Sequence, residues 1–278
     1  MKKISRRSFM AAAAVSVAAL ALTACGGSAS SAASSVASSA ASSEAASSAA
    51  AAELTTVEAG KLTMATNAAF PPYEMTTDAG EFEGIDVDTA KAIAEKLGLE
   101  LQIDDMDFDA ALLSVQQGKA DIVMAGVTVT DERKAVMDFS DSYATGIQSI
   151  IVPNDSDIAS PDDRPGKTIG TQRGTTGYIY CSDDFGDENV VAYDDGLTAV
   201  QALNNGQVDA VVIDNAPAQE FVAANPGLKV LDTSYAEEDY AIGMAKGSAL
   251  EDAVNKALEE LKADGTLQAI VDKYINAN

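Results

Sequence analysis

The residues between Gly126 and Arg133 have the chemical types that bind the two charged ends of a free amino acid. The guanidinium of Arg133 offers a planar fork of N–H donors that matches a carboxylate. The hydroxyl of Thr128 and the bare carbonyl of Gly126 are acceptors that suit an ammonium group. An arginine in a first helical turn can instead be solvated or pair with its neighbours Asp131 and Glu132, so these residues alone leave both interpretations open.

A strand and a helix start are expected on either side of these residues. Residues 121–126 form a short apolar run rich in β-branched side chains, and the run ends in a glycine where the backbone can leave a sheet. Thr130 is a helix N-cap type, and the two acidic residues after it favour the first turn of a helix. The pattern therefore predicts a strand, a short loop and a helix that begins after Thr130.

The N-terminal region has the pattern of a processing signal. A basic start with four Lys or Arg residues precedes the apolar stretch 11–22, and Leu-Thr-Ala-Cys-Gly follows at 22–26. We expect a lipoprotein signal peptide over 1–24 and a diacylglycerol on the thiol of Cys25. Residues 25–55 would form the lipidated cysteine and a Ser/Ala-rich disordered tether. The pair Arg6 and Arg7 also fits a twin-arginine signal, so the exporter stays open.

Composition excludes several functions. The chain has 18 basic and 43 acidic residues, and a polyanion of this size repels nucleic acid. It has no histidine, which argues against metallohydrolase and histidine-dependent triad chemistry. We expect no catalytic residue, no metal and no cofactor. If Cys25 carries lipid, Cys181 has no intramolecular partner and no structural disulfide forms.

Strand and helix patterns alternate, which predicts an α/β fold with largely parallel sheets. The same sequence pattern occurs twice, since residues 60–63 resemble residues 166–170 and residues 116–123 resemble residues 204–211. We infer two related lobes, lobe 1 from 60–147 plus 241–278 and lobe 2 from 152–236, joined by a two-segment hinge at 146–153 and 240–245. Two generic helix-to-strand joints are the alternative. The detailed pattern predicts strands at 61–66, 99–103 and 120–126 and helices at 89–97, 108–117, 250–261 and 265–275.

Several motifs then resemble one family in the right order. Gly-Ile-Asp-Val-Asp at 84–88 is followed by a helix, Asp-Glu-Arg stands at 131–133, and Asp-Phe-Ser stands at 138–140. The chain from Lys61 to its C-terminus resembles solute-binding protein family 3, the polar amino-acid-binding proteins of ABC importers. The resemblance implies a two-lobed, type II periplasmic-binding-protein-like fold that closes on one free amino acid and delivers it to a membrane permease. It also implies an extracytoplasmic, lipid-anchored monomer.

The resemblance implies a set of ligand-binding residues. Arg133 would grip the α-carboxylate, Gly126 and Thr128 would bind the α-ammonium, and the remaining contacts would come from Asn67, Phe70, Phe108, Gln172, Thr176 and Asp214. In this set Asp214 pairs with the ammonium, Thr176 contacts the carboxylate, the two Phe rings sandwich the side chain, and the two amides tune selectivity. Alternatively, Thr176 is a plain helix N-cap and the Phe rings are core. Asn67 stands where some members have Asp, and an amide alone would not neutralise a cation, so the ligand is a polar amino acid of open identity.

Two other functions fit the same scaffold. One is a periplasmic-type arogenate or prephenate dehydratase, which needs a general acid in the cleft. The sequence offers no acid beyond the residues already expected to hold a ligand, so we favour a binding protein over an enzyme. The other is an amino-acid sensor domain, which the sequence does not separate from an importer component.

Overall fold

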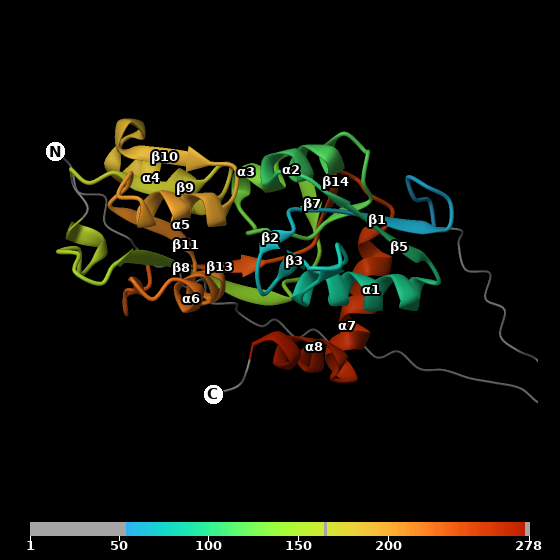
Figure 1. Ribbon diagram of the computed structural model, residues 1–278. Coiled ribbons are helices and arrows are strands. Elements are labelled where there is room, and N and C mark those ends of the chain that lie inside the picture. The colour runs from blue at the N-terminus through green and yellow to red at the C-terminus, as the bar shows by residue number, and fades with distance from the viewer. Residues whose placement is uncertain (1–53, 164–165, 276–278) are drawn as a thin grey trace, which may run out of the picture. The chain divides into compact units, whose positions relative to one another are not determined.

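Two β-sheets with helices packed against them make up most of the described part of the chain (Figure 1). The structure is a computed structural model that describes residues 54–163 and 166–275. The predicted signal peptide, Cys25 and the tether as far as residue 53 lie outside the described residues. Among the described residues, no helix combines the length and the apolar character needed to cross a bilayer.

The first sheet is mixed. Its strands lie in the order β5 (Glu100–Asp105), β1 (Lys61–Thr66), β6 (Ile122–Val123), β14 (Gly243–Ala245) and β7 (Met137–Phe139). β1 runs parallel to β5 and β6, whereas β14 runs antiparallel to β6 and β7. The predicted strand over 61–66 is confirmed residue for residue.

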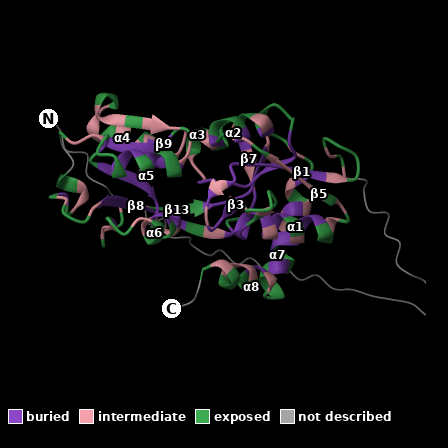
Figure 2. Ribbon diagram, in the orientation of Figure 1, coloured by how far each residue is buried: buried purple, intermediate pink, exposed green. Residues whose placement is uncertain are grey.

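Helices cover both faces of this sheet. Successive side chains of a strand point to opposite faces, so β1 contributes side chains to two buried clusters. Leu62 and Met64 join the buried cluster that includes residues of α1 (Ile85–Leu97) and α7 (Glu251–Ala263), against which α8 (Thr266–Tyr274) packs. Ala65 instead joins a cluster with α2 (Phe108–Gln116). Figure 2 shows the buried residues along β1 and on the inner side of α1.

The second sheet has six strands in the described residues. Their order is β10 (Val190–Tyr193), β9 (Ile169–Gln172), β11 (Ala210–Asp214), β8 (Ala144–Pro153) and β12 (Leu228–Val230), and β13 (Ala236–Tyr240) also pairs with β8. The helices that pack on it are α4 (Thr176–Phe185), α5 (Gly196–Asn204) and α6 (Asn215–Ala224). Short 3-10 turns lie at Pro161–Asp163 and Asp187–Asn189. β9 runs parallel to its two neighbours, and β8 runs antiparallel to all of its partners.

The two joints that echo each other in sequence have the same local structure. α2 and α5 each end just before a glycine in the left-handed region, at φ 66° and 68°. Asp121 then donates its N–H to the carbonyl of Thr63 and accepts the N–H of Thr63 on its side chain, at 2.9 and 2.8 Å. Asp209 makes the same reciprocal pair with Thr168, at 2.7 and 2.7 Å. The shared bonding favours a repeated unit over two unrelated joints.

The chain passes from one sheet to the other twice. β7 ends at Phe139 in the first sheet and β8 begins at Ala144 in the second, whereas β13 ends at Tyr240 in the second sheet and β14 begins at Gly243 in the first. The N–H of Tyr143 donates to the carbonyl of Tyr240 at 2.9 Å, so the two passages lie side by side. The hinge segment expected at 240–245 therefore includes the ends of two strands that pair in different sheets. The hinge segment expected at 146–153 is wrong, because these residues belong to β8 within the second sheet and the chain crosses before them. The residue bounds of the two lobes stay a prediction.

Other boundaries differ from the expected ones for local reasons. α1 begins at Ile85, ahead of the predicted start at Thr89, because acidic side chains in its first turn stabilise the helix N-terminus. The third predicted strand shortens to β6, because the N–H of Gly126 bonds to the side chain of Asp86 and not to a neighbouring strand. Residues 67–83, which lie outside the predicted strands, form a small antiparallel sheet of β2 (Ala69–Phe70), β3 (Glu74–Thr76) and β4 (Phe82–Glu83).

Candidate functional site

One pocket brings together every residue that the sequence predicts to bind a ligand. The pocket contains about 310 Å³ of empty space, part of it open to solvent. Its lining includes Asn67, Phe70, Phe108, Gly126, Thr128, Arg133, Gln172, Thr176 and Asp214. Glu74, Ala125 and Thr175 complete the lining, and the sequence did not single them out. The side chains come from segments on both sheets, so the pocket depends on how the chain passes between them.

Arg133 lies at the end of the short helix α3 (Asp131–Lys134), where Thr130 caps the helix by accepting the N–H of Arg133 at 3.1 Å. Its guanidinium donates to the carbonyl of Thr128 at 2.8 Å and to the carbonyl of Gly174, in the loop before α4, at 3.0 Å. It also lies over the ring of Phe108, 5.4 Å from the centroid. A guanidinium has five N–H donors, so donors remain for an anion in the pocket. These contacts oppose the interpretation of a solvated residue.

Gly126 is held in place by a buried carboxylate. Asp86, at the start of α1, accepts the N–H of Gly126 at 3.0 Å and the hydroxyl of Tyr143 at 2.8 Å. Burial raises the pKa of Asp86 to about 6, while the bonds from Gly126 and Tyr143 act in the opposite direction. The bond to Asp86 thus fixes the backbone of Gly126, which lines the pocket.

Asp214 ends β11, and each of its carboxylate oxygens accepts one hydrogen bond. One oxygen accepts the hydroxyl of Tyr240, and the other accepts the amide of Gln148 at 2.8 Å. Burial raises the pKa of Asp214 to about 7, and the nearby carboxylate of Glu238 also raises it, whereas the bonds from Tyr240 and Gln148 lower it. A cation beside this group would stabilise its ionised form.

The two amides predicted to tune selectivity contact each other. The side-chain N–H of Gln172 donates to the side-chain oxygen of Asn67 at 2.9 Å, and the amide of Asn67 donates to the carbonyl of Met106 at 3.0 Å. Gln172 lies on the second sheet and Asn67 directly follows β1 of the first, so this bond joins the two halves of the pocket. Both side chains are buried.

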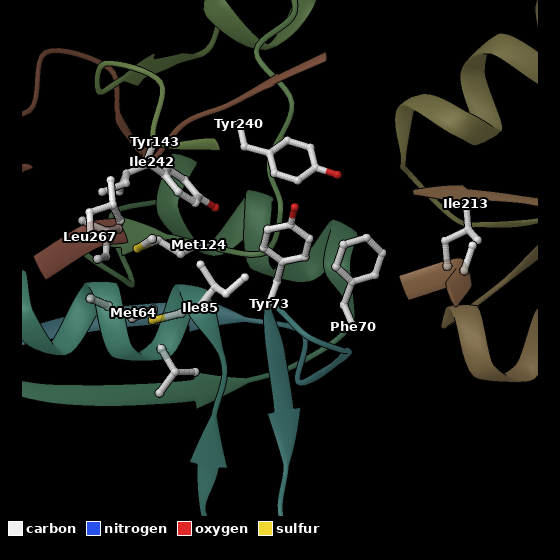
Figure 3. Close-up of a cluster of buried hydrophobic side chains, with 14 of the residues drawn as sticks. Met64, Phe70, Tyr73, Ile85, Met124, Tyr143, Ile213, Tyr240, Ile242 and Leu267 are labelled. Carbon is white, nitrogen blue, oxygen red and sulfur yellow. The ribbon is translucent and has the colours of Figure 1, made fainter. Parts of the chain in front are cut away.

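The two phenylalanines are both core and lining. Phe70 stacks on Tyr73, with ring centroids 5.9 Å apart, and Tyr73 meets Tyr240 edge to face at 5.3 Å. Figure 3 shows these three rings together. Phe108 begins α2 and packs in the second cluster of the first sheet. The two interpretations left open for these rings are therefore compatible. Thr176 is not an N-cap, because Thr175 caps α4 by accepting the N–H of Tyr178.

Glu74 is the charged pocket residue that sequence reasoning missed. It lies on β3, is 0% exposed, and lines the pocket. Neither of its carboxyl oxygens accepts a hydrogen bond within the described residues. Burial, and then the nearby Asp86 carboxylate, raise the pKa of Glu74 well above its ordinary value. The signal in the sequence was only an acidic residue soon after the Phe-Pro-Pro-Tyr loop, which also fits a solvated hairpin.

Comparisons with known proteins agree with this geometry. The family model for bacterial extracellular solute-binding proteins, family 3, matches residues 62–277. The L-cystine-binding protein TcyJ of Escherichia coli is 32% identical over 225 residues, which cover 80% of this chain and 85% of that protein.

Solved structures are similar over the same region. The arginine-, lysine-, histidine-binding protein ArtJ of Geobacillus stearothermophilus has a TM-score of 0.75 at 34% identity, covering 78% of this chain and 96% of that chain. An ancestral arginine-binding protein bound to arginine has a TM-score of 0.74 at 42% identity, covering 78% of this chain and 99% of that chain.

These likenesses confirm the expected two-lobed, type II periplasmic-binding-protein-like fold. Proteins of an extracellular family work outside the cytoplasm, which confirms the expected extracytoplasmic location. The family match spans most of the chain, and the pocket holds the residues that its motifs predicted. The chain belongs to the bacterial extracellular solute-binding proteins, family 3.

Proposed function

We propose that this protein captures a free amino acid with a cationic side chain, arginine before others, and delivers it to the permease of an ABC importer. Capture of an amino acid for an importer is the function that the family and the named relatives support. The relatives include proteins named for binding arginine, lysine and histidine. The observation that carries the choice of a cationic side chain is the buried carboxyl of Glu74 in the pocket.

The zwitterionic end of the ligand meets groups of matching charge. The free N–H donors of Arg133 suit the α-carboxylate, with the hydroxyl of Thr176 as a further contact. Asp214, the hydroxyl of Thr128 and the carbonyl of Gly126 suit the α-ammonium. A bonded carboxylate such as Asp214 still has lone pairs to offer an ammonium.

The ligand side chain then meets Glu74 between aromatic rings. A buried carboxyl whose oxygens accept no hydrogen bond costs free energy, and a guanidinium or ammonium beside it would offset that cost. The faces of Phe70 and Phe108 attract cations. A ligand cation beside Glu74 would favour its ionised form, which would supply the negative charge that Asn67 lacks. The ligand identity that the sequence left open is therefore proposed to be a cationic amino acid.

Closure of the two lobes on the ligand follows from where these groups stand. Arg133, Thr128 and Glu74 belong to the half built on the first sheet, and Gln172 and Asp214 belong to the second sheet. A ligand shifts a conformational equilibrium only by the difference in its affinity for the two states. Contacts to both halves exist only when the halves meet, so they would favour the closed state.

The test is a calorimetric screen of refolded, ligand-stripped protein against arginine, lysine, histidine, glutamine and cystine. We expect arginine to bind most tightly, and Glu74→Gln to weaken arginine binding at least about 30-fold while changing glutamine binding less than threefold, because only arginine loses a charged partner. Glu83→Gln, an exposed position on the next strand of the same small sheet, is the matched control. Tightest binding of glutamine or cystine, or an unchanged arginine affinity in Glu74→Gln, would contradict the choice of a cationic ligand.

We also propose that the protein is a monomer held to the membrane by lipid on Cys25, as the Leu-Thr-Ala-Cys-Gly motif indicates. Metabolic labelling with an alkyne fatty acid should mark the wild-type chain and leave Cys25→Ala unmarked. Labelling of Cys25→Ala would refute this anchor. We further propose binding without turnover, so that incubation with arogenate yields no phenylalanine.

A further inference from the structure

Glu238 is a buried acidic residue that touches the pocket residues without lining the pocket. It lies on β13, where its neighbours Glu237 and Asp239 are exposed but Glu238 is 6% exposed. One of its oxygens, Oε2, accepts the hydroxyl of Thr128 and the side-chain amide of Gln148, both at 3.0 Å. The strand thus turns one carboxylate inward, behind the residues expected to meet the ligand ammonium.

The bond to Glu238 fixes the polarity of the Thr128 hydroxyl. A hydroxyl has a single hydrogen, and an ionised carboxylate only accepts. The hydrogen of Thr128 is therefore committed to Glu238, and only lone pairs remain on the other side of its oxygen. The hydroxyl of Thr176 lies 3.5 Å from that oxygen and, toward it, can act only as a donor.

Gln148 holds Glu238 in this position. Its amide nitrogen has two hydrogens, and they go to Asp214 at 2.8 Å and to Glu238 at 3.0 Å. Gln148 lies on β8, which pairs with β11 and its last residue Asp214 and also with β13. Asp214 and Glu238 therefore share the amide of Gln148 as a donor. The bond to either carboxylate orients the amide toward the other one.

The backbone around Thr128 is attached to the same strand. The N–H of Val129 donates to the carbonyl of Asp239 at 3.0 Å, and the N–H of Ala241 donates to the carbonyl of Val127 at 3.1 Å. These bonds flank Thr128 where it pairs with Tyr240, two residues after Glu238 on the same strand. The alignment of hydroxyl and carboxylate is thus built into the chain passage between the sheets.

We propose that Glu238 is a positioning residue for the ammonium end of the ligand, because it makes the Thr128 hydroxyl an obligate acceptor. This inference rests on the proposed function, in which Thr128 accepts from the α-ammonium. A neutral amide at position 238 can donate to the hydroxyl instead, which would turn the hydrogen of Thr128 toward the ligand. An ammonium has no lone pair to receive it, so binding would weaken.

The test is a double-mutant cycle with calorimetric binding of L-arginine. We expect Glu238→Gln to weaken binding at least about tenfold, and Thr128→Val to do the same, since each removes the oriented acceptor. In the Thr128→Val background, Glu238→Gln should then change affinity less than threefold, because the hydroxyl it orients is gone. Glu237→Gln, the exposed neighbour on the same strand, should bind as wild type does.

A merely structural role would give a different pattern. Thermal unfolding of each variant identifies loss of fold. If Glu238→Gln does not fold, Glu238→Asp, which keeps the charge, replaces it in the binding measurements. Thr128→Ser keeps the hydroxyl and should restore the full effect of Glu238→Gln. If the losses of Glu238→Gln and Thr128→Val multiply, or if Glu238→Gln binds within threefold of wild type, the inference is wrong. The proposed function would survive that result as long as Arg133 and Glu74 variants still lose arginine.

Discussion

At the scale of residues, some polar groups of the pocket stand close together in the chain, whereas others meet only through the fold. Gly126, Thr128 and Arg133 lie within one loop and helix start, so their motif was visible. Glu238 reaches Thr128 across 110 positions, and Glu74 approaches Asp86 only because a small sheet folds back on α1. With 43 acidic residues in the chain, composition offers no reason to choose these two.

Arg133 is the residue whose loss should cost most. In Arg133→Ala we expect affinity for an amino acid to fall by about two to four decades, since an unpaired carboxylate left in a buried site costs about 3–5 kcal/mol. The affinity of Arg133→Lys should lie between those of wild type and Arg133→Ala, because lysine keeps the charge but lacks the planar fork. Calorimetry measures both, with the exposed Arg173→Ala as the control for charge alone. Binding by Arg133→Ala within threefold of wild type would remove Arg133 from the site.

At the scale of elements, the order and type of strands and helices followed from hydrophobic period and from Gly and Pro punctuation. The predicted helices over 108–117, 250–261 and 265–275 match α2, α7 and α8 closely. The errors lie where tertiary bonds override local pattern. β6 is short because Asp86 draws the chain out of the sheet, and the final crossing is two strands because its ends pair in separate sheets.

The start of α1 offers a sharp test of element packing. Gly84 has φ 135°, and an added Cβ would lie 2.1 Å from the carbonyl oxygen of Tyr73. Gly84→Ala should therefore lower the free energy of unfolding by at least about 3 kcal/mol, as backbone overlap adds to the unfavourable φ. Gly80 has φ 79° with open space around it, so Gly80→Ala should cost only about 1–2 kcal/mol. Equal losses in urea unfolding would show that overlap at Gly84 is relieved.

At the scale of the whole molecule, acidic groups gather around one pocket with few cations to balance them. Glu74, Asp86, Asp214 and Glu238 are all buried there, and Arg133 is the cation that lines the pocket. The pKa of Asp214 is raised to about 7 and that of Asp86 to about 6, chiefly by burial. The chain has no histidine, so proton exchange near neutral pH on binding reports on carboxyl groups.

Arginine affinity should therefore depend on pH. An ammonium beside Asp214 favours the carboxylate, so below pH 7 the ligand must displace a proton, and affinity should fall by up to about tenfold per pH unit between pH 7 and 5. Calorimetry at pH 7 in buffers of different ionisation enthalpy should count protons released on binding. Proton uptake on binding, or an affinity that stays the same from pH 8 to pH 5, would contradict this linkage.

Stability of the ligand-stripped protein should show the opposite trend. A carboxyl whose pKa is raised in the folded state binds more protons there than in the unfolded state over roughly pH 4–7, so its contribution to the free energy of unfolding falls as pH rises through that window. Asp214→Asn removes this pH-dependent contribution. The free energy of unfolding of the variant, measured with urea, should therefore increase relative to that of wild type as pH rises from 4 to 7. A difference that shrinks as pH rises would contradict the raised pKa of Asp214.

The bonds from Gln172 to Asn67 and from Arg133 to Gly174 tie the rim of one half of the molecule to the other. Opening must break both of them, whatever occupant sits inside. These two bonds limit the rate of opening for every ligand. Asn67→Ala should therefore shorten the residence time of strong and weak ligands by a similar factor. How long a ligand stays bound before it reaches a permease would then be governed in part by the contact between Gln172 and Asn67.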